Sequence, residues 1–252
     1  MQSYLREKSL PKTSKIRIFA DVELKIGQKV DLGTEQSHYL LSVMRAQSGD
    51  RILIFNGKDG EFECSLIING KKDCSLNVIA KTRDFAPPQN IWLMFAPLKK
   101  DRTDFVIEKA TELGVAKIVP VITRYAISDK IRIDRWKAQA IEAAEQSRRV
   151  EIPTIVESIT LEKLLSEWDS ERRLYFMDET GQGIPVAEAF KNTPVPAAFL
   201  IGPEGGFAEQ ELQLLRSKSY ARAVSLGPRI LRAETAAVAA ICCWQALNGD
   251  WK

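Results

Sequence analysis

The sequence predicts an α/β protein in which a small β domain precedes a larger domain built on a parallel sheet. Short apolar runs separated by asparagine–glycine turns fill the first third of the chain. A proline pair at Pro87-Pro88 follows, and apolar runs then alternate with segments of helical periodicity. Such a change of pattern is typical of a domain boundary, so we expect a small β-barrel at residues 1–84 and an α/β domain at residues 85–252.

Tight turns support the β domain. Asn56-Gly57 and Asn69-Gly70 supply the positive φ angles that short hairpin connections require. The expected strands are residues 52–55, 61–68 and 76–79, and a short helix is expected at residues 37–45. This spacing over about 80 residues is typical of a small barrel.

Alternation of strand-like and helical segments supports the second domain, because a parallel sheet needs helical crossovers on its faces. The expected strands are residues 91–96, 115–122, 174–177, 197–201 and 223–226. The expected helices are residues 101–113, 134–149, 208–218 and 233–247. The last of these is apolar on nearly every face, so we expect it to be buried.

Composition narrows the class of protein without identifying its function. Of the 252 residues 45% are hydrophobic and 27% are charged, with a net charge of +3, as in an ordinary globular protein. Residues 1–20 hold five cations against the single acid Glu7. That segment suits phosphate contacts, although a solvated arm explains its composition equally well.

The cysteine and histidine content predicts no metal site. Four cysteines show no C-x-x-C spacing and there is one histidine, His38, so a zinc site is not expected. Cys242 and Cys243 lie in an apolar helix and are expected to be buried, reduced core residues. No apolar run reaches the roughly 20 residues of a membrane helix and no secretory signal is apparent, which predicts a cytoplasmic protein.

Two glycine- and proline-containing loops carry most of the functional information. Residues 202–206 (GPEGG) and 226–236 (LGPRILRAETA) each follow an apolar run and precede a helix. Open α/β sheets bind ligands at the carboxyl ends of their strands. Neither loop has the spacing of a nucleotide-binding motif, and Pro203 removes a backbone donor. A tight turn without a ligand is the alternative for the first loop, whereas arginines beside a buried helix in the second predict an anionic or carbonyl-rich ligand.

Both loops closely resemble motifs of the SPOUT methyltransferases, specifically of the 16S ribosomal RNA uracil-N3 methyltransferases. The matching segments are LIGPEGGF at 200–207, SLGPRILRAETA at 225–236, SHYL at 37–40 with VMR at 43–45, KATELGV at 109–115, and IEAAEQ at 141–146. The resemblance therefore spans nearly the whole chain, in order. One departure is Arg148, which stands where that family commonly has glycine.

The resemblance implies an N-terminal PUA-like β-barrel for RNA contact and a C-terminal domain with a trefoil knot. It also implies a homodimer that uses S-adenosylmethionine to methylate N3 of a uridine near the 3′ end of 16S rRNA, either free or in the 30S subunit. A related SPOUT enzyme acting on another base or a ribose 2′-hydroxyl of rRNA or tRNA is one alternative. An RNA-binding protein without catalysis is another.

The same resemblance assigns roles to individual residues. The donor pocket is expected to be lined by Met177, Leu200, Ile201, Gly202, Leu226, Gly227, Ile230, Leu231 and Ala236, with Asp178 beside Met177. Arg232 is expected to stabilise negative charge on the uracil, and Glu204 or Glu234 is the second choice, as proton acceptor. The expected RNA contacts are Arg6, Arg17, Lys99, Arg102, Arg124, Arg149 and Arg229.

Overall fold

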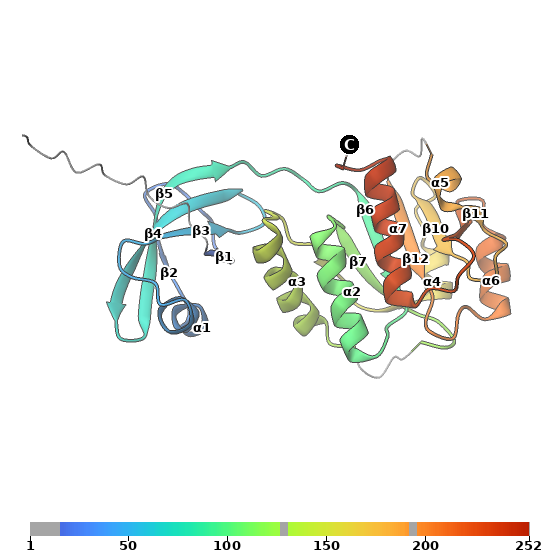
Figure 1. Cartoon of the computed structure of the whole chain (residues 1–252), viewed down its shortest axis with the longest axis horizontal. Helices are drawn as coiled ribbons and strands as arrows, with labels where there is room; N and C mark the ends of the chain where they lie inside the picture. Colours follow the sequence, from blue (N-terminus) through green and yellow to red (C-terminus); the bar gives the residue numbers. More distant parts are fainter. Residues whose placement is uncertain (1–15, 127–130, 192–195, 252) are drawn as a thin grey trace, which may run out of the picture. The chain divides into compact units, whose positions relative to one another are not determined.

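The structure is a computed structural model that describes residues 16–126, 131–191 and 196–251. The chain forms two compact units, Met1–Ala86 and Pro87–Lys252, divided two residues after the expected boundary (Figure 1). Arg6, an expected RNA contact, lies outside the described residues. None of the described helices has both the length and the apolar character needed to cross a bilayer.

The N-terminal unit is built on a five-stranded sheet of order β1-β3-β4-β5-β2. Its strands are β1 (Arg17–Phe19), β2 (Lys29–Asp31), β3 (Arg51–Phe55), β4 (Glu61–Gly70) and β5 (Asp73–Arg83). β1 pairs with β3 in parallel and the other pairs are antiparallel. The three expected strands are confirmed, whereas the three-residue strands β1 and β2 were not predicted.

The helical segment of this unit differs from the expected single helix at 37–45. It consists of α1 (Thr34–His38) followed directly by the π-helix η1 (Tyr39–Val43). Leu40 is fully buried against the sheet, and the segment ends at Arg45, whose φ is 53°. The helix therefore starts three residues earlier than expected and changes its winding where Leu40 enters the core.

Arg17 has a structural role in this unit and is not available as the expected RNA contact. Its side chain is buried, and its Nε lies 2.6 Å from Glu61 Oε2. The guanidinium carbon also lies 3.7 Å from the centre of the Phe55 ring. Burial alone would raise the pKa of Glu61, but Arg83 and Arg17 hold it below its usual value.

The C-terminal unit contains a sheet of order β11-β13-β10-β12-β6-β7-β8, with β9 also paired to β7. Its strands are β6 (Ile91–Phe95), β7 (Lys117–Ile122), β8 (Thr154–Ile155), β9 (Ile159–Thr160), β10 (Arg173–Met177), β11 (Ile184–Pro185), β12 (Ala197–Ile201) and β13 (Ala221–Ser225). Every pairing is parallel. The expected α/β fold is confirmed, and the knot remains a prediction.

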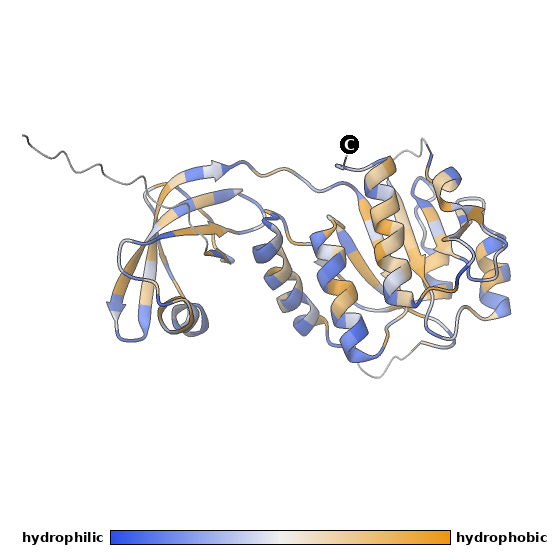
Figure 2. Ribbon diagram, viewed as in Figure 1, coloured by the Kyte–Doolittle hydropathy of each residue, from blue (hydrophilic) through white to orange (hydrophobic). Residues whose placement is uncertain are grey.

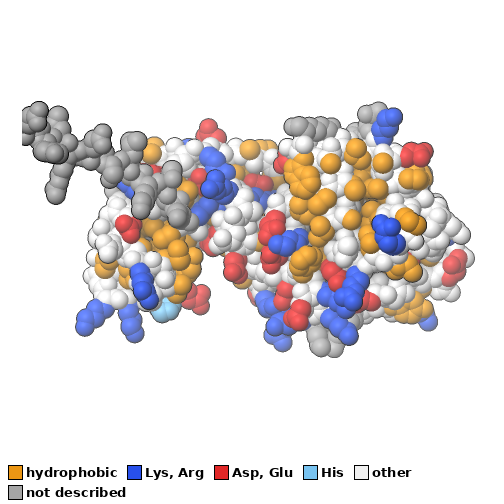
Figure 3. Space-filling view, in the orientation of Figure 1, with side chains coloured by type: hydrophobic (Ala, Val, Ile, Leu, Met, Phe, Trp, Pro, Cys, Tyr) orange, Lys and Arg blue, Asp and Glu red, His pale blue; other side chains and the backbone are white. Residues whose placement is uncertain are grey.

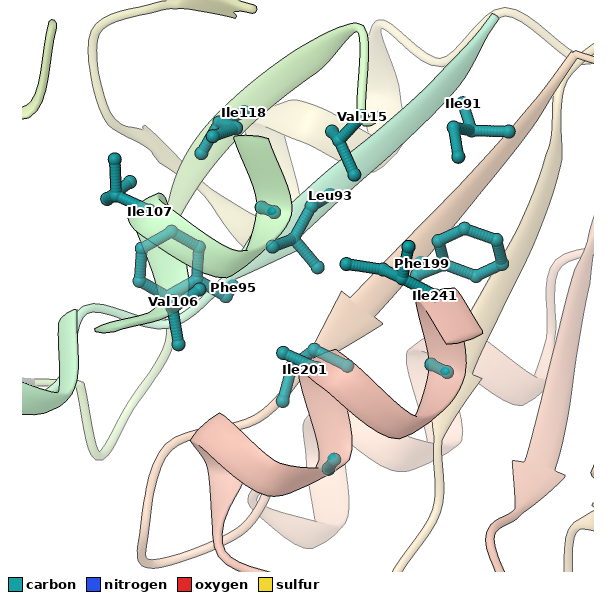
Figure 4. Close-up of a cluster of buried hydrophobic side chains, with 14 of the residues drawn as sticks. Ile91, Leu93, Phe95, Val106, Ile107, Val115, Ile118, Phe199, Ile201 and Ile241 are labelled. Atoms are coloured by element: carbon teal, nitrogen blue, oxygen red, sulfur yellow. The ribbon is translucent and has the colours of Figure 1, made fainter. Parts of the chain in front are cut away.

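Helices cover both faces of this sheet. They are α2 (Lys100–Glu112), α3 (Ile133–Ser147), α4 (Leu161–Ser166), α5 (Val186–Ala189), α6 (Glu209–Arg216) and α7 (Ala233–Leu247). Alternate residues of β6, such as Leu93 and Phe95, pack with α2, α3 and α7. Figure 4 shows both side chains on the side of the sheet that faces α2 and α7. Met94 faces the other side, in a core that includes α4 and α6. Apolar residues accordingly concentrate along the central strands (Figure 2).

Helix α7 begins and ends as expected, but it is not buried on all sides. Ala240, Ile241 and Trp244 lie in the core, whereas Cys242 and Cys243 are only half-buried. The expectation that both cysteines are core residues is therefore wrong. Exposed and half-buried residues of α7, Cys242 among them, form an apolar stripe that faces away from the sheet.

The two residues that follow α3, Arg148 and Arg149, were both singled out in the sequence, and the structure shows the role of each. Arg148 ends the helix with φ 60° and ψ 20°, the left-handed conformation that glycine adopts most easily. Arg149 is buried, and its guanidinium donates to the carbonyl oxygens of Thr111 and Val115, each at 2.7 Å. It also pairs with Glu151, so Arg149 supports the α2–β7 connection instead of presenting its charge to RNA.

Replacing Arg148 with glycine is expected to stabilise the C-terminal unit by about 0.5–1 kcal/mol, because the strain of a Cβ in the left-handed region exceeds the added entropy of unfolding. Urea denaturation measures the free energy of unfolding. Arg148→Ala keeps the Cβ and serves as the control. An equal gain in the alanine variant would show that loss of the exposed charge, not backbone strain, is responsible.

Candidate ligand-binding site

A cavity of about 560 Å³ lies at the carboxyl ends of the adjacent strands β13, β10 and β12. Three segments form its wall. They are residues 177–181 at the end of β10, residues 201–204 and 206 at the end of β12, and residues 226–233 after β13, together with Val224, Ala236 and Arg102. Because the strands run parallel, both glycine-containing loops reach the same edge of the sheet.

Eight of the nine expected donor-pocket residues line this cavity. They are Met177, Ile201, Gly202, Leu226, Gly227, Ile230, Leu231 and Ala236. Leu200 does not line it, because successive side chains of a strand point to opposite faces. Its side chain lies instead in the core on the other face of the sheet, with Met94 and Phe176.

The first glycine loop is a compact turn whose backbone lines the cavity. The N–H of Gly206 donates to the carbonyl oxygen of Pro203 at 2.9 Å, and Gly206 has φ +71°. A Cβ there would lie 2.1 Å from Glu179 Oε1, and one at Gly202 would lie 3.1 Å from the buried ring of Phe207. The positive φ disfavours a side chain at Gly206, and a side chain at Gly202 would require the Phe207 ring to shift by a few tenths of an ångström. Backbone atoms therefore form the wall at both positions.

Asp178 organises the wall that follows β10. Its side chain is fully buried, and Oδ1 accepts hydrogen bonds from the backbone N and the hydroxyl of Thr180, at 2.9 and 2.6 Å. Oδ2 pairs with Arg216 Nη2 at 2.8 Å. Burial by itself would raise the pKa of Asp178, but Thr180 and Arg216 hold it below its usual value. Asp178 therefore stays ionised and supports this wall.

An ion-pair cluster lies where α2 meets both loops. Arg102 Nη1 is 2.9 Å from Glu204 Oε1, and Arg102 Nε is 3.7 Å from Glu234 Oε1. Arg102 and Glu204 line the cavity, but Glu234 does not. No local pattern predicts this cluster, because the arginine stands 102 residues before the nearer glutamate in sequence.

Arg229 and Arg232 also line the cavity, and they differ from Arg102 in their surroundings. Both are exposed, and Arg232 immediately precedes α7. Neither has a carboxylate partner within the part of the chain that the structure describes. Their guanidinium groups are therefore free to meet a negatively charged or carbonyl-containing ligand.

Two further expected RNA contacts lie on the same edge of the sheet. Lys99 follows β6 and Arg124 follows β7, and both are exposed. Tyr125 packs near the first loop, since a Cβ at Gly205 would lie 3.4 Å from it. Figure 3 shows cations gathered on the face where α2 and α7 begin.

Among the described residues no cluster of carboxylates, cysteines or histidine suits a metal ion.

Comparisons with known proteins agree with both units. Residues 86–245 match the family model of the RNA methyltransferase domain, and residues 32–79 match that of the RNA methyltransferase PUA domain. The chain is 34% identical over 229 residues to ribosomal RNA small subunit methyltransferase E of Rickettsia conorii, which covers 89% of this chain and 93% of that protein. The Bacillus subtilis protein of the same name is 30% identical, covering 86% and 91%.

Solved structures agree as well. Ribosomal RNA small subunit methyltransferase E from Neisseria gonorrhoeae, bound to S-adenosyl methionine, has a TM-score of 0.86 at 33% identity, covering 94% of this chain and 99% of that one. A putative methyltransferase from Legionella pneumophila in complex with the same cofactor has a TM-score of 0.81 at 30% identity, covering 92% and 97%. The chain belongs to the ribosomal RNA small subunit methyltransferase E family, and it joins a PUA domain to an α/β RNA methyltransferase domain.

Proposed function

We propose that this protein transfers a methyl group from S-adenosylmethionine to N3 of a uridine near the 3′ end of 16S rRNA. The observation that carries the proposal is the cavity at the carboxyl ends of β13, β10 and β12, whose wall comes from the two loops that resemble the uracil-N3 methyltransferase motifs. Relatives with the same fold bind S-adenosylmethionine. A ribosomal substrate implies that the protein works in the cytoplasm.

The cavity suits S-adenosylmethionine in size and in chemistry. Small-molecule sites usually enclose about 300–1,000 Å³, and this cavity falls within that range. Ile201, Leu226 and Leu231 offer apolar surface to an adenine ring, while the backbone atoms of Gly202 and Gly227 allow close polar contacts. When bound, the donor supplies an electrophilic methyl group.

The chain's own residues handle the charge that methylation creates. Uracil N3 must lose its proton as it gains the methyl group, and negative charge develops on the adjacent carbonyl oxygens. Arg232 lines the cavity and has no carboxylate partner among the described residues, so its guanidinium is available to those oxygens. A donor held in this way contributes about 3–4 kcal/mol. Glu204 and Glu234 are the second choice, as acceptors of the N3 proton. Arg102 already binds Glu204, and Glu234 does not line the cavity.

The exposed cations Lys99, Arg124 and Arg229 lie on the cavity's edge of the sheet and are proposed to contact RNA phosphates. They would orient the strand that carries the target uridine. The PUA domain is proposed to contribute further RNA contacts, with either free 16S rRNA or the 30S subunit as substrate.

We further propose that the protein is a homodimer joined through the outward stripe of α7, formed by Thr235, Ala239, Cys242 and Ala246. These residues are exposed or half-buried and mostly apolar, and Figure 3 shows apolar side chains along this helix. A contiguous exposed apolar surface of this kind is typical of an interface between subunits.

Arg232→Ala is expected to lower kcat for methyl transfer by about 10²–10³-fold with little change in donor affinity, because it removes a contact that strengthens in the transition state. Labelled S-adenosylmethionine, 30S subunits and naked 16S rRNA provide the assay, with mass spectrometry of the product nucleoside. Arg222→Ala removes an exposed arginine of β13 that does not line the cavity, and it serves as the control. A 2′-O-methylated product would contradict the N3 assignment, and no transfer despite donor binding would contradict the substrate.

Ala239→Glu is expected to convert the dimer into monomers at micromolar concentration, because it places a charge in the proposed apolar interface. Light scattering coupled to gel filtration measures the mass. Ala138→Glu makes the same change on the exposed face of α3 and should leave the mass unchanged. A monomeric wild-type protein, or equal masses for all three, would refute the interface.

A further inference from the structure

Arg102 is the residue at which three separate segments of the C-terminal unit meet. It lies in the first turn of α2, contacts Glu204 of the first loop at 2.9 Å, and lies 3.7 Å from Glu234 at the start of α7. The first loop follows β12, and Glu234 lies where the second loop enters α7. One guanidinium therefore joins the two loops that form the cavity wall.

Charge explains why this contact matters. Two glutamates close to one cation would repel each other if that cation were absent. The side chains of Arg102, Glu204 and Glu234 are only 32%, 31% and 14% exposed, so water screens that repulsion incompletely. Glu234 Oε2 is buried and has no hydrogen-bond partner among the described residues, and Arg102 is the one ion-pair partner of this carboxylate in the described ranges.

The backbone that carries Arg102 is held in place. Its N–H donates to the carbonyl oxygen of Lys99 at 3.0 Å, closing the first turn of α2. One turn later, Val106 and Ile107 are buried in the core that also contains α7. Arg102 thus projects from a helix anchored in the core toward carboxylates on two separate segments.

We propose that Arg102 is a positioning residue for donor binding and not an RNA contact. Its guanidinium donors are directed at two carboxylates, which hold the loops at the spacing that the cavity requires. An RNA phosphate would have to displace those carboxylates first. The proposal rests on the proposed function for the identity of the donor, S-adenosylmethionine.

The test compares donor binding with RNA binding in Arg102→Gln. Calorimetry with S-adenosylmethionine should show a dissociation constant about tenfold higher than in the wild type, a typical coupling within one ion-pair network. Affinity for a 16S rRNA 3′ fragment, measured over a range of salt, should keep its salt dependence. Arg135→Gln is the matched control, because Arg135 pairs with Asp104 of α2 and lines no part of the cavity.

The opposite pattern would overturn the proposal. Loss of a phosphate contact lowers the slope of log affinity against log salt by about 0.7 for single-stranded RNA. That change with unaltered donor affinity would make Arg102 an RNA contact. The pair Arg102→Glu with Glu204→Arg should recover at least part of the donor affinity that Arg102→Glu alone loses, and no recovery would also count against the proposal.

Two further measurements distinguish a failure of this inference from misfolding of the variant and from a failure of the proposed function. If Arg102→Gln is unfolded by circular dichroism, Arg102→Lys keeps the charge without the planar fork and should bind donor with intermediate affinity. If the wild type binds no S-adenosylmethionine, the proposed function fails. Faster amide hydrogen exchange at residues 202–206 and 227–232 in the ligand-free Arg102→Gln variant would still support the positioning role, and unchanged exchange would refute it.

Discussion

The parallel pairing of β13, β10, β12 and β6 is the constraint on which the site depends. Parallel strands place all their carboxyl ends at one edge, so segments that are far apart in sequence must meet there. This is why residues 177–181, 201–204 and 226–233 form one wall. The pairing also brings Lys99 and Arg124 to that edge, because β6 and β7 run in the same direction. A cavity with cations around it follows from the direction of the strands.

The pattern of apolar residues in the sequence predicts the long helices and strands but gives no sign of the shortest strands. Helix α7 has the predicted bounds because its apolar run is uninterrupted. Strands β8, β9 and β11 have two residues each, too few to show any period. Leu200 was misplaced for a related reason. Every residue of β12 is buried, so the strand shows no apolar–polar alternation that would assign Leu200 and Ile201 to opposite faces.

Charge is the property that sequence reasoning handled least well. Arg17 and Arg149 were expected at an RNA surface, but both are buried against partners far away in sequence, and Arg149 also pairs with nearby Glu151. A buried guanidinium needs such partners, and they stand 44 residues away at Glu61 and 34 residues away at Val115. Local composition contains no signal for contacts of this range. The left-handed Arg148 was flagged by resemblance alone, and its backbone angles explain why glycine is common there.

The arginines of the C-terminal unit divide by whether their charge is already neutralised. Arg149 donates to two carbonyl oxygens and pairs with Glu151, and Arg102 faces two carboxylates. Arg229 and Arg232 line the cavity and have no carboxylate partner in the described ranges. An unneutralised cation is better placed to stabilise charge that appears during a reaction, because an existing ion pair offsets part of the field of a paired one. Position on the cavity wall and freedom from a carboxylate fit both Arg229 and Arg232. The family resemblance is what assigns the proposed chemical step to Arg232, while Arg102 is proposed to keep the loops in place.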